Sequence, residues 1–254
     1  MMRTDKSKTP EDRLIRLPLG ITNDYLIPLK EGYLLFDTGY KWVYKKFLQQ
    51  LEKHSVSAQE IRYVLLSHHH DDHVGFLNQL VQDFPTIQVI MHEKTVSLIA
   101  EGKNNTKEGG CLVNRRIAFL LDLKSKISPQ WDLSFPPYAK RACDIVLEGE
   151  QMLLPFQACA PLMVFLTPGH SSDSITLAYG QKILCGDLAS NFLNWAGTHH
   201  LTVFNENIEQ VYASWEQLLK RSPTMIFPAH GKPFLPKKLA RNLGKSGGHA
   251  VPYC

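Results

Sequence analysis

The sequence lacks the features that mark several large classes of protein. No apolar run approaches the ~20 residues that a membrane-spanning helix needs, and the charged start of the chain, residues 1–13, contains no apolar segment typical of a secretory signal. The five cysteines are widely spaced, and none forms a Cys-x-x-Cys pair. We therefore expect reduced thiols in a cytoplasmic protein that contacts no membrane.

Charge and nucleotide motifs are equally sparse. The formal net charge of +4 is too small to predict a nucleic-acid partner. Gly-x-Ser-x-Gly, the P-loop and the dinucleotide fingerprint are all missing, so neither a serine hydrolase nor a nucleotide-binding protein is predicted. The 254 residues, 44% of them hydrophobic, suffice for a single domain over 1–254 without repeats or linkers. We expect a monomer or homodimer that acts on a small molecule.

One short stretch, Ser67–His73, is dense in metal-ligand residues and reads Ser-His-His-His-Asp-Asp-His. Side chains alternate faces in an extended segment, so His68 and His70 point the same way. Asp72 and His73 fall where the chain turns into a helix and can face a neighbouring point. The flanks are a predicted buried strand, 63–66, and a predicted helix, 74–81. Apolar flanks argue against an exposed histidine-rich tract that binds metal incidentally.

Potential ligands also follow four predicted apolar strands. The pairs of strand end and ligand are Leu66 with His68, Leu166 with His170, Cys185 with Asp187, and Phe227 with His230. Each of the last three alone is weak, because a strand-end Asp is usually a turn residue and a lone His is often a core residue. Ligands at the ends of several strands of a sheet can meet at one edge, and the recurrence therefore predicts a shared site.

The seven candidate ligands suit two metal ions. We assign His68, His70 and His170 to one ion, Asp72, His73 and His230 to the other, and Asp187 as a bridge between them. Imidazole and carboxylate ligands suit divalent ions. Zinc is the expected metal, with iron, manganese and cobalt as alternatives.

Several neighbours of these ligands have less direct predicted roles. His69 and Asp71 point away by alternation and are assigned to orienting or capping. Asp37 either caps its Asp-Thr-Gly turn or accepts a hydrogen bond from a metal-bound histidine. We expect His92, at another strand end, to be packed rather than a ligand, and Ser171 to form local hydrogen bonds instead of acting as a nucleophile.

The rest of the chain alternates strands with helices. Predicted strands cover 14–19, 25–29, 32–39, 88–92, 144–148, 151–154, 162–166, 174–178, 182–185 and 224–227, and predicted helices cover 41–54, 111–127 and 208–219. Residues 101–142 form an insertion that we interpret as a lid or pocket wall, with ordinary packing as the alternative. Aromatic and histidine side chains that could line a substrate pocket, or equally lie in the core or face solvent, are Trp131, Phe135, Tyr138, Phe192, Trp195, His199 and His200.

With these motifs in their chain order, the sequence resembles the metallo-β-lactamase-fold superfamily over nearly its whole length, from Asn23–Ile27 to Pro228–Gly231. The resemblance implies a layered α+β fold, an αβ/βα sandwich of two facing mixed sheets with helices outside, and a dinuclear site at one edge. Asp37 matches the aspartate of the family's Asp-Thr-Gly turn, which orients a metal-bound histidine. Asp187 matches the bridging aspartate of the glyoxalase II, lactonase and nuclease-like branches, although the tyrosine that typically follows it in lactonases is replaced here by residues 188–192.

The expected activity is metal-dependent hydrolysis of an ester, thioester or lactone by a hydroxide bridging the metals. Asp72 and His73 are assigned to the catalytic step, with Asp72 able to hold or pass a proton. A phosphodiesterase or nuclease of the same fold, β-lactam hydrolysis and a non-hydrolytic metal-binding sensor remain alternatives.

Overall fold

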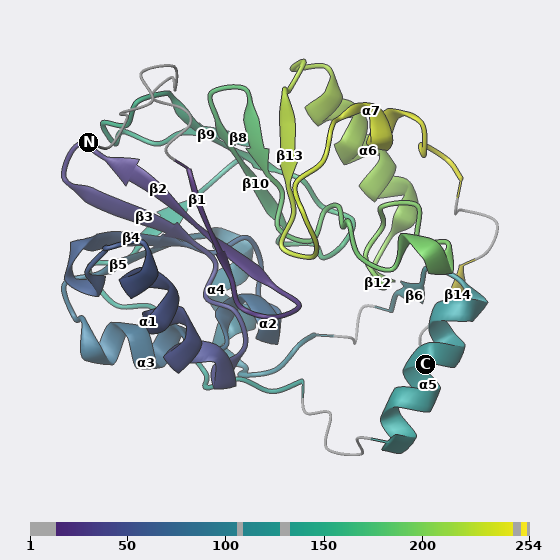
Figure 1. The fold of residues 1–254 in the computed structure, drawn as a ribbon, viewed down its shortest axis with the longest axis horizontal. Helices are drawn as coiled ribbons and strands as arrows, with labels where there is room; N and C mark the ends of the chain where they lie inside the picture. Colours follow the sequence, from purple (N-terminus) through teal and green to yellow (C-terminus); the bar gives the residue numbers. More distant parts are fainter. Residues whose placement is uncertain (1–13, 106–108, 128–132, 246–249, 253–254) are drawn as a thin grey trace, which may run out of the picture.

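The computed structural model describes residues 14–105, 109–127, 133–245 and 250–252 (Figure 1). The described strands form two large sheets and a small one. The first large sheet has the order β1 (Ile15–Pro18), β2 (Asn23–Leu29), β3 (Gly32–Phe36), β4 (Ile61–Leu65), β5 (Gln88–His92), β7 (Ile145–Leu147). The second has the order β13 (Met225–Phe227), β11 (Lys182–Leu184), β10 (Ile175–Tyr179), β9 (Leu162–Leu166), β8 (Gln151–Leu153).

Both large sheets are mixed. In the first, β1, β2 and β3 pair antiparallel, whereas β3, β4, β5 and β7 pair parallel. In the second, β11 and β13 are parallel and the other pairs antiparallel. The small sheet places β6 (Cys111–Leu112) between β12 (Phe204–Asn205) and β14 (Val251–Pro252). The predicted layered α+β fold with two mixed sheets is confirmed.

Alternating strand residues build the layers of the sandwich. Leu34 and Phe36 point into a core shared by the two large sheets, whereas Leu35 between them points to the helices. Val89 and Ile90 divide between the same two cores. The helices are α1 (Tyr44–Lys53), α2 (Asp71–Val74), α3 (Leu77–Asp83) and α4 (Glu93–Ala100) beside the first sheet, and α5 (Arg115–Ile127), α6 (Ile208–Leu219) and α7 (Lys237–Ala240) beside the second.

Helix α6 fixes two of the loops that follow strands of the second sheet. The fully buried Trp215 donates from Nε1 to the carbonyl of Leu188 at 2.7 Å, and Ser214 donates from Oγ to the carbonyl of Pro168 at 2.8 Å. A Cβ at Gly169, whose φ is +132°, would lie 2.4 Å from the backbone N of Val211. Only glycine permits this close approach, so the loops after β9 and β11 are held against one helix.

The described parts of the segment 101–142 lie on both halves of the molecule, the first half being the first large sheet with its helices and the second half the second large sheet with its helices. Residues 101–105 and 133–142 lie beside the first half, whereas β6 and α5 pack on the second (Figure 1). The two arms of this segment run antiparallel, since Phe135 donates from its backbone N to the carbonyl of Gly102 at 2.9 Å. Its outer part supplies β6 and α5, and Val113 and Ile117 are buried in the core of the second half.

Two predicted helices have different bounds in the structure. The helix expected from Cys111 begins at Arg115, because Cys111 and Leu112 pair as a strand with β12 and β14. The helix expected over 74–81 is divided into α2 and α3. Gly75 lies between them and donates from its backbone N to the carbonyl of Gly39, in another loop, at 2.8 Å. Helix α4 lies in a stretch without a predicted element.

Asp144 anchors the C-terminal arm of the segment 101–142 to the first sheet. Its carboxylate accepts hydrogen bonds from Val89 N at 3.0 Å, Tyr138 Oη at 2.7 Å and Arg141 Nη2 at 2.9 Å. Burial would raise the pKa of Asp144, but the hydrogen bonds from Arg141 and Tyr138 hold it below its usual value. The ionised form is therefore the one that stabilises this connection.

We expect Asp144→Asn to lower the free energy of unfolding by about 2–4 kcal/mol at neutral pH, because buried donors lose a charged acceptor. The folded pKa lies below the unfolded value of about 3.9, so this stabilisation is fully present above that value and is lost as the pH falls through the folded pKa. Urea unfolding of the metal-free proteins at neutral and acid pH measures it. Asp122→Asn, which removes an exposed pair with Lys126, is the control and should change stability little.

Candidate metal centre

The loops that follow four strands meet at one edge of the sandwich, and two of these loops bring three histidines together. His68 and His70 follow β4, and His170 follows β9. Nε2 of His170 lies 3.1 Å from Nε2 of His68 and 2.9 Å from Nδ1 of His70. All three side chains are buried, and their ligand atoms converge as the alternation of residues 68 and 70 predicts.

A second group gathers beside the first. It consists of Asp72 and His73 at the start of α2, Asp187 after β11, and His230 after β13. Nε2 of His230 lies 3.0 Å from Oδ2 of Asp72 and 3.3 Å from Oδ1 of Asp187. Nε2 of His73 lies 3.4 Å from that same oxygen.

Asp187 lies between the two groups. Its Oδ1 faces His73 and His230 of the second group, while its Oδ2 lies 3.7 Å from Nε2 of His170 in the first. One carboxylate oxygen is therefore directed at each group, the arrangement that a bridging ligand requires. All seven residues predicted as ligands are thus close to one another in two adjacent groups.

Protonation differs between the groups. Burial lowers the pKa of His68 and His70, and the surrounding histidines lower it further, so these rings are neutral and keep lone pairs. Burial also opposes charge in the second group, but there Asp37, Asp72 and Asp187 hold the pKa of His73 well above its usual value. Protons on the second group's histidines therefore balance its carboxylates, and a divalent cation could replace them.

Unsatisfied polar atoms indicate where cations would fit. Nε2 of His73 and Oδ1 of Asp187 are buried, and neither forms a hydrogen bond within the described part of the chain. Such atoms are costly unless something binds them. The ligand atoms of each group lie within 4.8 Å of one another. Imidazole and carboxylate donors in this arrangement fit divalent transition-metal ions.

Asp37 orients part of this centre. It accepts hydrogen bonds from Ser67 N at 2.7 Å and Ser67 Oγ at 2.8 Å, and its Oδ2 lies 2.8 Å from Nδ1 of His73. Its φ of +65° is a conformation that Asp tolerates better than most residues. The contact fixes Nδ1 of His73 as the donor, so Nε2 can act as a ligand once a cation displaces its proton. Of the two predicted roles for Asp37, the geometry therefore favours orienting a candidate ligand.

Other candidate ligands are oriented in the same way. Nδ1 of His230 lies 3.0 Å from the carbonyl of Ile21, and Nδ1 of His170 lies 3.0 Å from the carbonyl of Phe204. A backbone carbonyl can only accept, so each Nδ1 donates and each Nε2 faces the centre with a lone pair when the ring is neutral.

His69 and Asp71 turn away from the centre and tie its loop to neighbouring segments. Nδ1 of His69 lies 2.9 Å from Oδ1 of Asp173, and Nε2 of His69 accepts from the backbone N of Asn105 at 3.0 Å. Asn104 accepts from the backbone N of Asp71 and donates to its carboxylate, both at 2.7 Å. The orienting or capping role assigned to His69 and Asp71 agrees with these contacts. Asp173 and Asn104 were not predicted, and only the position of Asp173 three residues after His170 could have indicated its role.

We expect Asn104→Ala to lower the free energy of unfolding by about 1–2 kcal/mol, because Asp71 loses both hydrogen bonds that it forms with Asn104 at the start of α2. Metal affinity should fall about tenfold, since Asp72 and His73 follow directly. Chelator competition and urea unfolding measure the two effects. Asn78→Ala removes the hydrogen bonds that the side-chain amide donates to the carbonyls of Pro136 and Pro137, and it should leave metal affinity unchanged. Equal metal affinity in wild type, Asn104→Ala and Asn78→Ala would contradict this role of Asn104.

The side chains predicted to line a substrate pocket do not share one environment. Phe135 and Tyr138 are buried in the core of the first half, so for these two the core alternative is correct. Phe192 and Trp195 are exposed. Trp131 lies outside the described residues.

The remaining histidines and Ser171 have local partners. His200 stacks on Phe234 and lies 2.8 Å from the carbonyl of Ser190 through its Nδ1, while neither His199 nor His200 belongs to the metal groups found among the described residues. His92 is buried and accepts from the backbone N of Lys94 at 3.3 Å, in agreement with its predicted packing role. Ser171 Oγ lies 2.6 Å from Ser174 Oγ.

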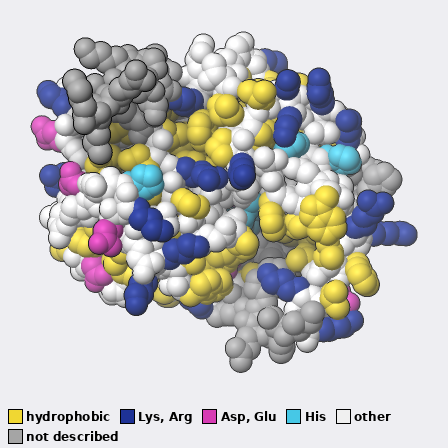
Figure 2. Space-filling model, in the orientation of Figure 1, with side chains coloured by type: hydrophobic (Ala, Val, Ile, Leu, Met, Phe, Trp, Pro, Cys, Tyr) yellow, Lys and Arg dark blue, Asp and Glu magenta, His cyan; other side chains and the backbone are white. Residues whose placement is uncertain are grey.

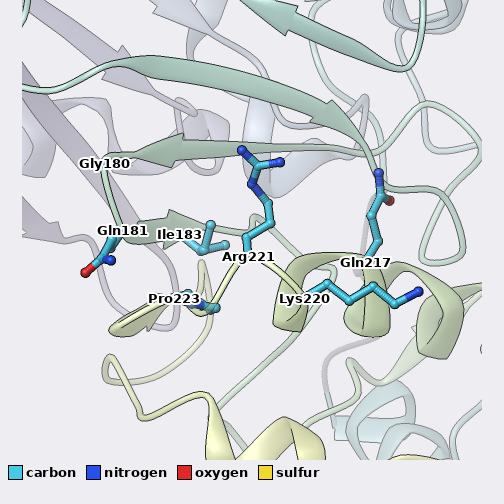
Figure 3. A pocket seen from close by; sticks show the side chains of 7 residues that line it. All are labelled: Gly180, Gln181, Ile183, Gln217, Lys220, Arg221 and Pro223. Atoms are coloured by element: carbon cyan, nitrogen blue, oxygen red, sulfur yellow. The ribbon is translucent and has the colours of Figure 1, made fainter.

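A hollow of about 390 Å³ lies at the end of the second sheet opposite to the loops that carry the candidate metal ligands. It is formed by the β10–β11 turn and the end of α6. Figure 3 shows its polar side chains diverging, because Lys220 runs along the helix while the guanidinium of Arg221 points toward a neighbouring strand. This arrangement lacks the convergent groups of the metal centre.

Among the described residues, none of the helices is both long and apolar enough to span a bilayer.

Comparison with known proteins agrees with this architecture. The chain is 24% identical over 222 residues to the uncharacterized protein YobT of Bacillus subtilis, covering 83% of each chain. A motif mutant of a metallo-β-lactamase from Cronobacter sakazakii superposes with a TM-score of 0.64 at 18% identity, covering 92% of this chain and 91% of that one. An archaeal superfamily protein from Sulfolobus tokodaii gives 0.61 at 17% identity, covering 91% and 85%.

The structural matches, at these low identities, show the fold alone. The family model of the metallo-β-lactamase superfamily matches residues 17–230, which span the four ligand-bearing loops described above. The chain therefore belongs to the metallo-β-lactamase superfamily.

Proposed function

We propose that this protein is a dinuclear metal-dependent hydrolase acting on the carbonyl group of an ester, thioester or lactone. The observation that carries the proposal is Asp187, whose two oxygens face two adjacent groups of candidate ligands. The first group would hold one ion through His68, His70 and His170. The second would hold another through Asp72, His73 and His230, and zinc is the proposed metal.

Divalent ions at these positions would supply Lewis acidity toward a carbonyl oxygen and lower the pKa of water. Asp72 would receive and pass on a proton; support comes from its side chain, which is 12% exposed, and from its Oδ2, which is 3.0 Å from Nε2 of His230. His73, held by Asp37, keeps the start of α2 at the centre and fixes the position of the neighbouring Asp72.

We further propose that the segment 101–142 forms one wall of the substrate site within a single domain over 1–254. Support comes from Asn104 and Asn105, which bond directly to the ligand-bearing loop at Asp71 and His69. A substrate bound at the centre would therefore lie close to the base of this segment. As further parts of the proposal, the protein acts in the cytoplasm, as a monomer or homodimer, without nucleic acid.

Turnover of a substrate panel tests the proposal. Protein with measured metal content is assayed on lactones, thioesters, esters, β-lactams and bis-p-nitrophenyl phosphate. We expect turnover of one or more of the first three classes, with the metal content approaching two ions per chain. Turnover of the phosphodiester or β-lactams alone would replace the carbonyl assignment by one of those activities. Inactivity on the whole panel at full metal occupancy would contradict the hydrolase.

A further inference from the structure

An apolar surface lies between α5 and the loop after Asp187, and none of the residues that line it is a candidate metal ligand. Phe119 is 66% exposed and Trp195 74% exposed, and Leu123, one helical turn after Phe119, is also exposed. Phe119 and Trp195 border a hollow of about 510 Å³, the α5 hollow, lined by Arg115, Arg116, Phe119, Leu120, Trp195 and Ala196. Figure 2 shows hydrophobic side chains gathered over this region with lysine and arginine side chains around them.

The two sides of the α5 hollow are joined to each other. Asn114, the residue before α5, donates from Nδ2 to the carbonyls of Ala196 at 3.2 Å and Gly197 at 2.9 Å. Its Oδ1 accepts from the backbone N of Ile117 at 3.0 Å and so caps the helix. Val113 and Ile117 are fully buried in the core of the second half. The helix and the loop thus form one surface, and the apolar exposure does not come from a detached helix.

Charge at the start of α5 is opposite to what helix stability favours. The first turn contains Arg115 and Arg116 and no acidic residue, although the positive end of the helix dipole favours anions there. Both arginines are exposed, and within the described part of the chain neither pairs with a carboxylate. The acid on the exposed face of α5, Asp122, is already paired with Lys126 at 2.7 Å. An anionic group would be favoured by both guanidiniums at once.

We propose that the α5 hollow binds a single anionic amphiphile, with its alkyl chain against Phe119, Leu120 and Trp195 and its anionic head at Arg115 and Arg116. The volume of about 510 Å³ is that of a small-molecule site. A second copy of the chain packed symmetrically on this face would bring the two arginine pairs together, and their repulsion opposes a dimer there. The proposal does not depend on the hydrolase activity.

Titration with decanesulfonate below its micelle concentration tests this site, because a sulfonate is a poor ligand for transition metals. We expect saturable binding by calorimetry and a blue shift of tryptophan fluorescence as Trp195 is covered. Trp195→Phe should lose the shift, whereas Trp42→Phe, which removes another exposed tryptophan stacked on Tyr40, should retain it. A shift that survives Trp195→Phe would overturn the location.

Two further variants separate the apolar and the charged contributions. Phe119→Ser should weaken decanesulfonate binding by about tenfold or more. Leu153→Ser, at a comparably exposed apolar residue of β8 (63%), is the matched control and should leave binding unchanged. Arg115→Gln combined with Arg116→Gln should reduce the preference for decanesulfonate over decyltrimethylammonium by about tenfold.

Other outcomes would overturn the proposal. Equal affinity for the anion and the cation, or equal binding by wild type and Phe119→Ser, would remove the site. Binding only to vesicles of anionic lipid, with none to the monomeric amphiphile, would assign the surface to a bilayer. A dimer in sedimentation experiments that Phe119→Ser dissociates, without amphiphile binding, would assign it to self-association.

Discussion

Replacing Asp187 with alanine should lower the metal content from two ions per chain to one or none and reduce kcat by several orders of magnitude. The substitution removes both oxygens that face the two ligand groups. It also removes the carboxylate that His73 and His230 share, while these residues keep their buried ring nitrogens. Burial opposes ionisation of Asp187, yet His230 and His73 hold its pKa well below the usual value, so the removed group is a charged one.

Elemental analysis after exhaustive dialysis and steady-state kinetics on the substrate identified by the panel measure these effects. Asp122→Ala, at an exposed carboxylate on α5, is the control and should keep both metal content and rate. Circular dichroism establishes that the Asp187→Ala chain is folded. Two tightly held ions and a full rate in Asp187→Ala would contradict the bridging role.

Changing Asp37 to asparagine should weaken metal binding about 10- to 100-fold although the side chains have nearly the same shape. Oδ1 of Asp37 accepts from the backbone N of Ser67, and Oδ2 faces Nδ1 of His73. Asparagine has one acceptor oxygen and one donor nitrogen, so it cannot accept in both directions. Either a buried N–H loses its acceptor, or the ring of His73 carries its proton on Nε2 and can no longer act as a ligand.

Competition with a chromophoric chelator measures the affinity of each site in Asp37→Asn. The matched control is Asp83→Asn, which makes the same chemical change at an exposed carboxylate that accepts from Tyr44 and Gln79. We expect wild-type metal affinity in the control. A similar affinity in Asp37→Asn and wild type would show that His73 does not depend on this hydrogen bond.

The candidate ligands could be predicted from sequence because each follows a short apolar strand. A buried strand places its last residues at an edge of the sheet, so the residue after it is directed by the backbone itself. Alternation then separates His68 and His70 from His69, and the structure shows this separation. Asp187 could be assigned a bridging position only because ligands for two groups were already counted on either side of it.

Contacts distant in sequence could not be predicted in this way. Asn104 has no periodic pattern or motif around it, yet it bonds to Asp71 from a segment 33 residues away. Asp173 lies 104 residues from His69. Such pairs depend on where the segment 101–142 packs and on how the two sheets face each other. Short-range sequence patterns encode neither arrangement, so they cannot predict these contacts.

The sequence by itself determined the ligand types, their order along the chain and the strands that precede them, because strand periodicity and the position of polar residues after strands are local properties. The layered mixed-sheet fold was expected from the resemblance to the superfamily and not from these local patterns. Tertiary structure decided that Asp187 directs one oxygen at each ligand group, since that depends on the packing of α6 beneath the loops. It also decided that α5 packs on the second half and that Phe119 and Trp195 stay exposed beside two arginines, because long-range packing alone selects which face of α5 is buried.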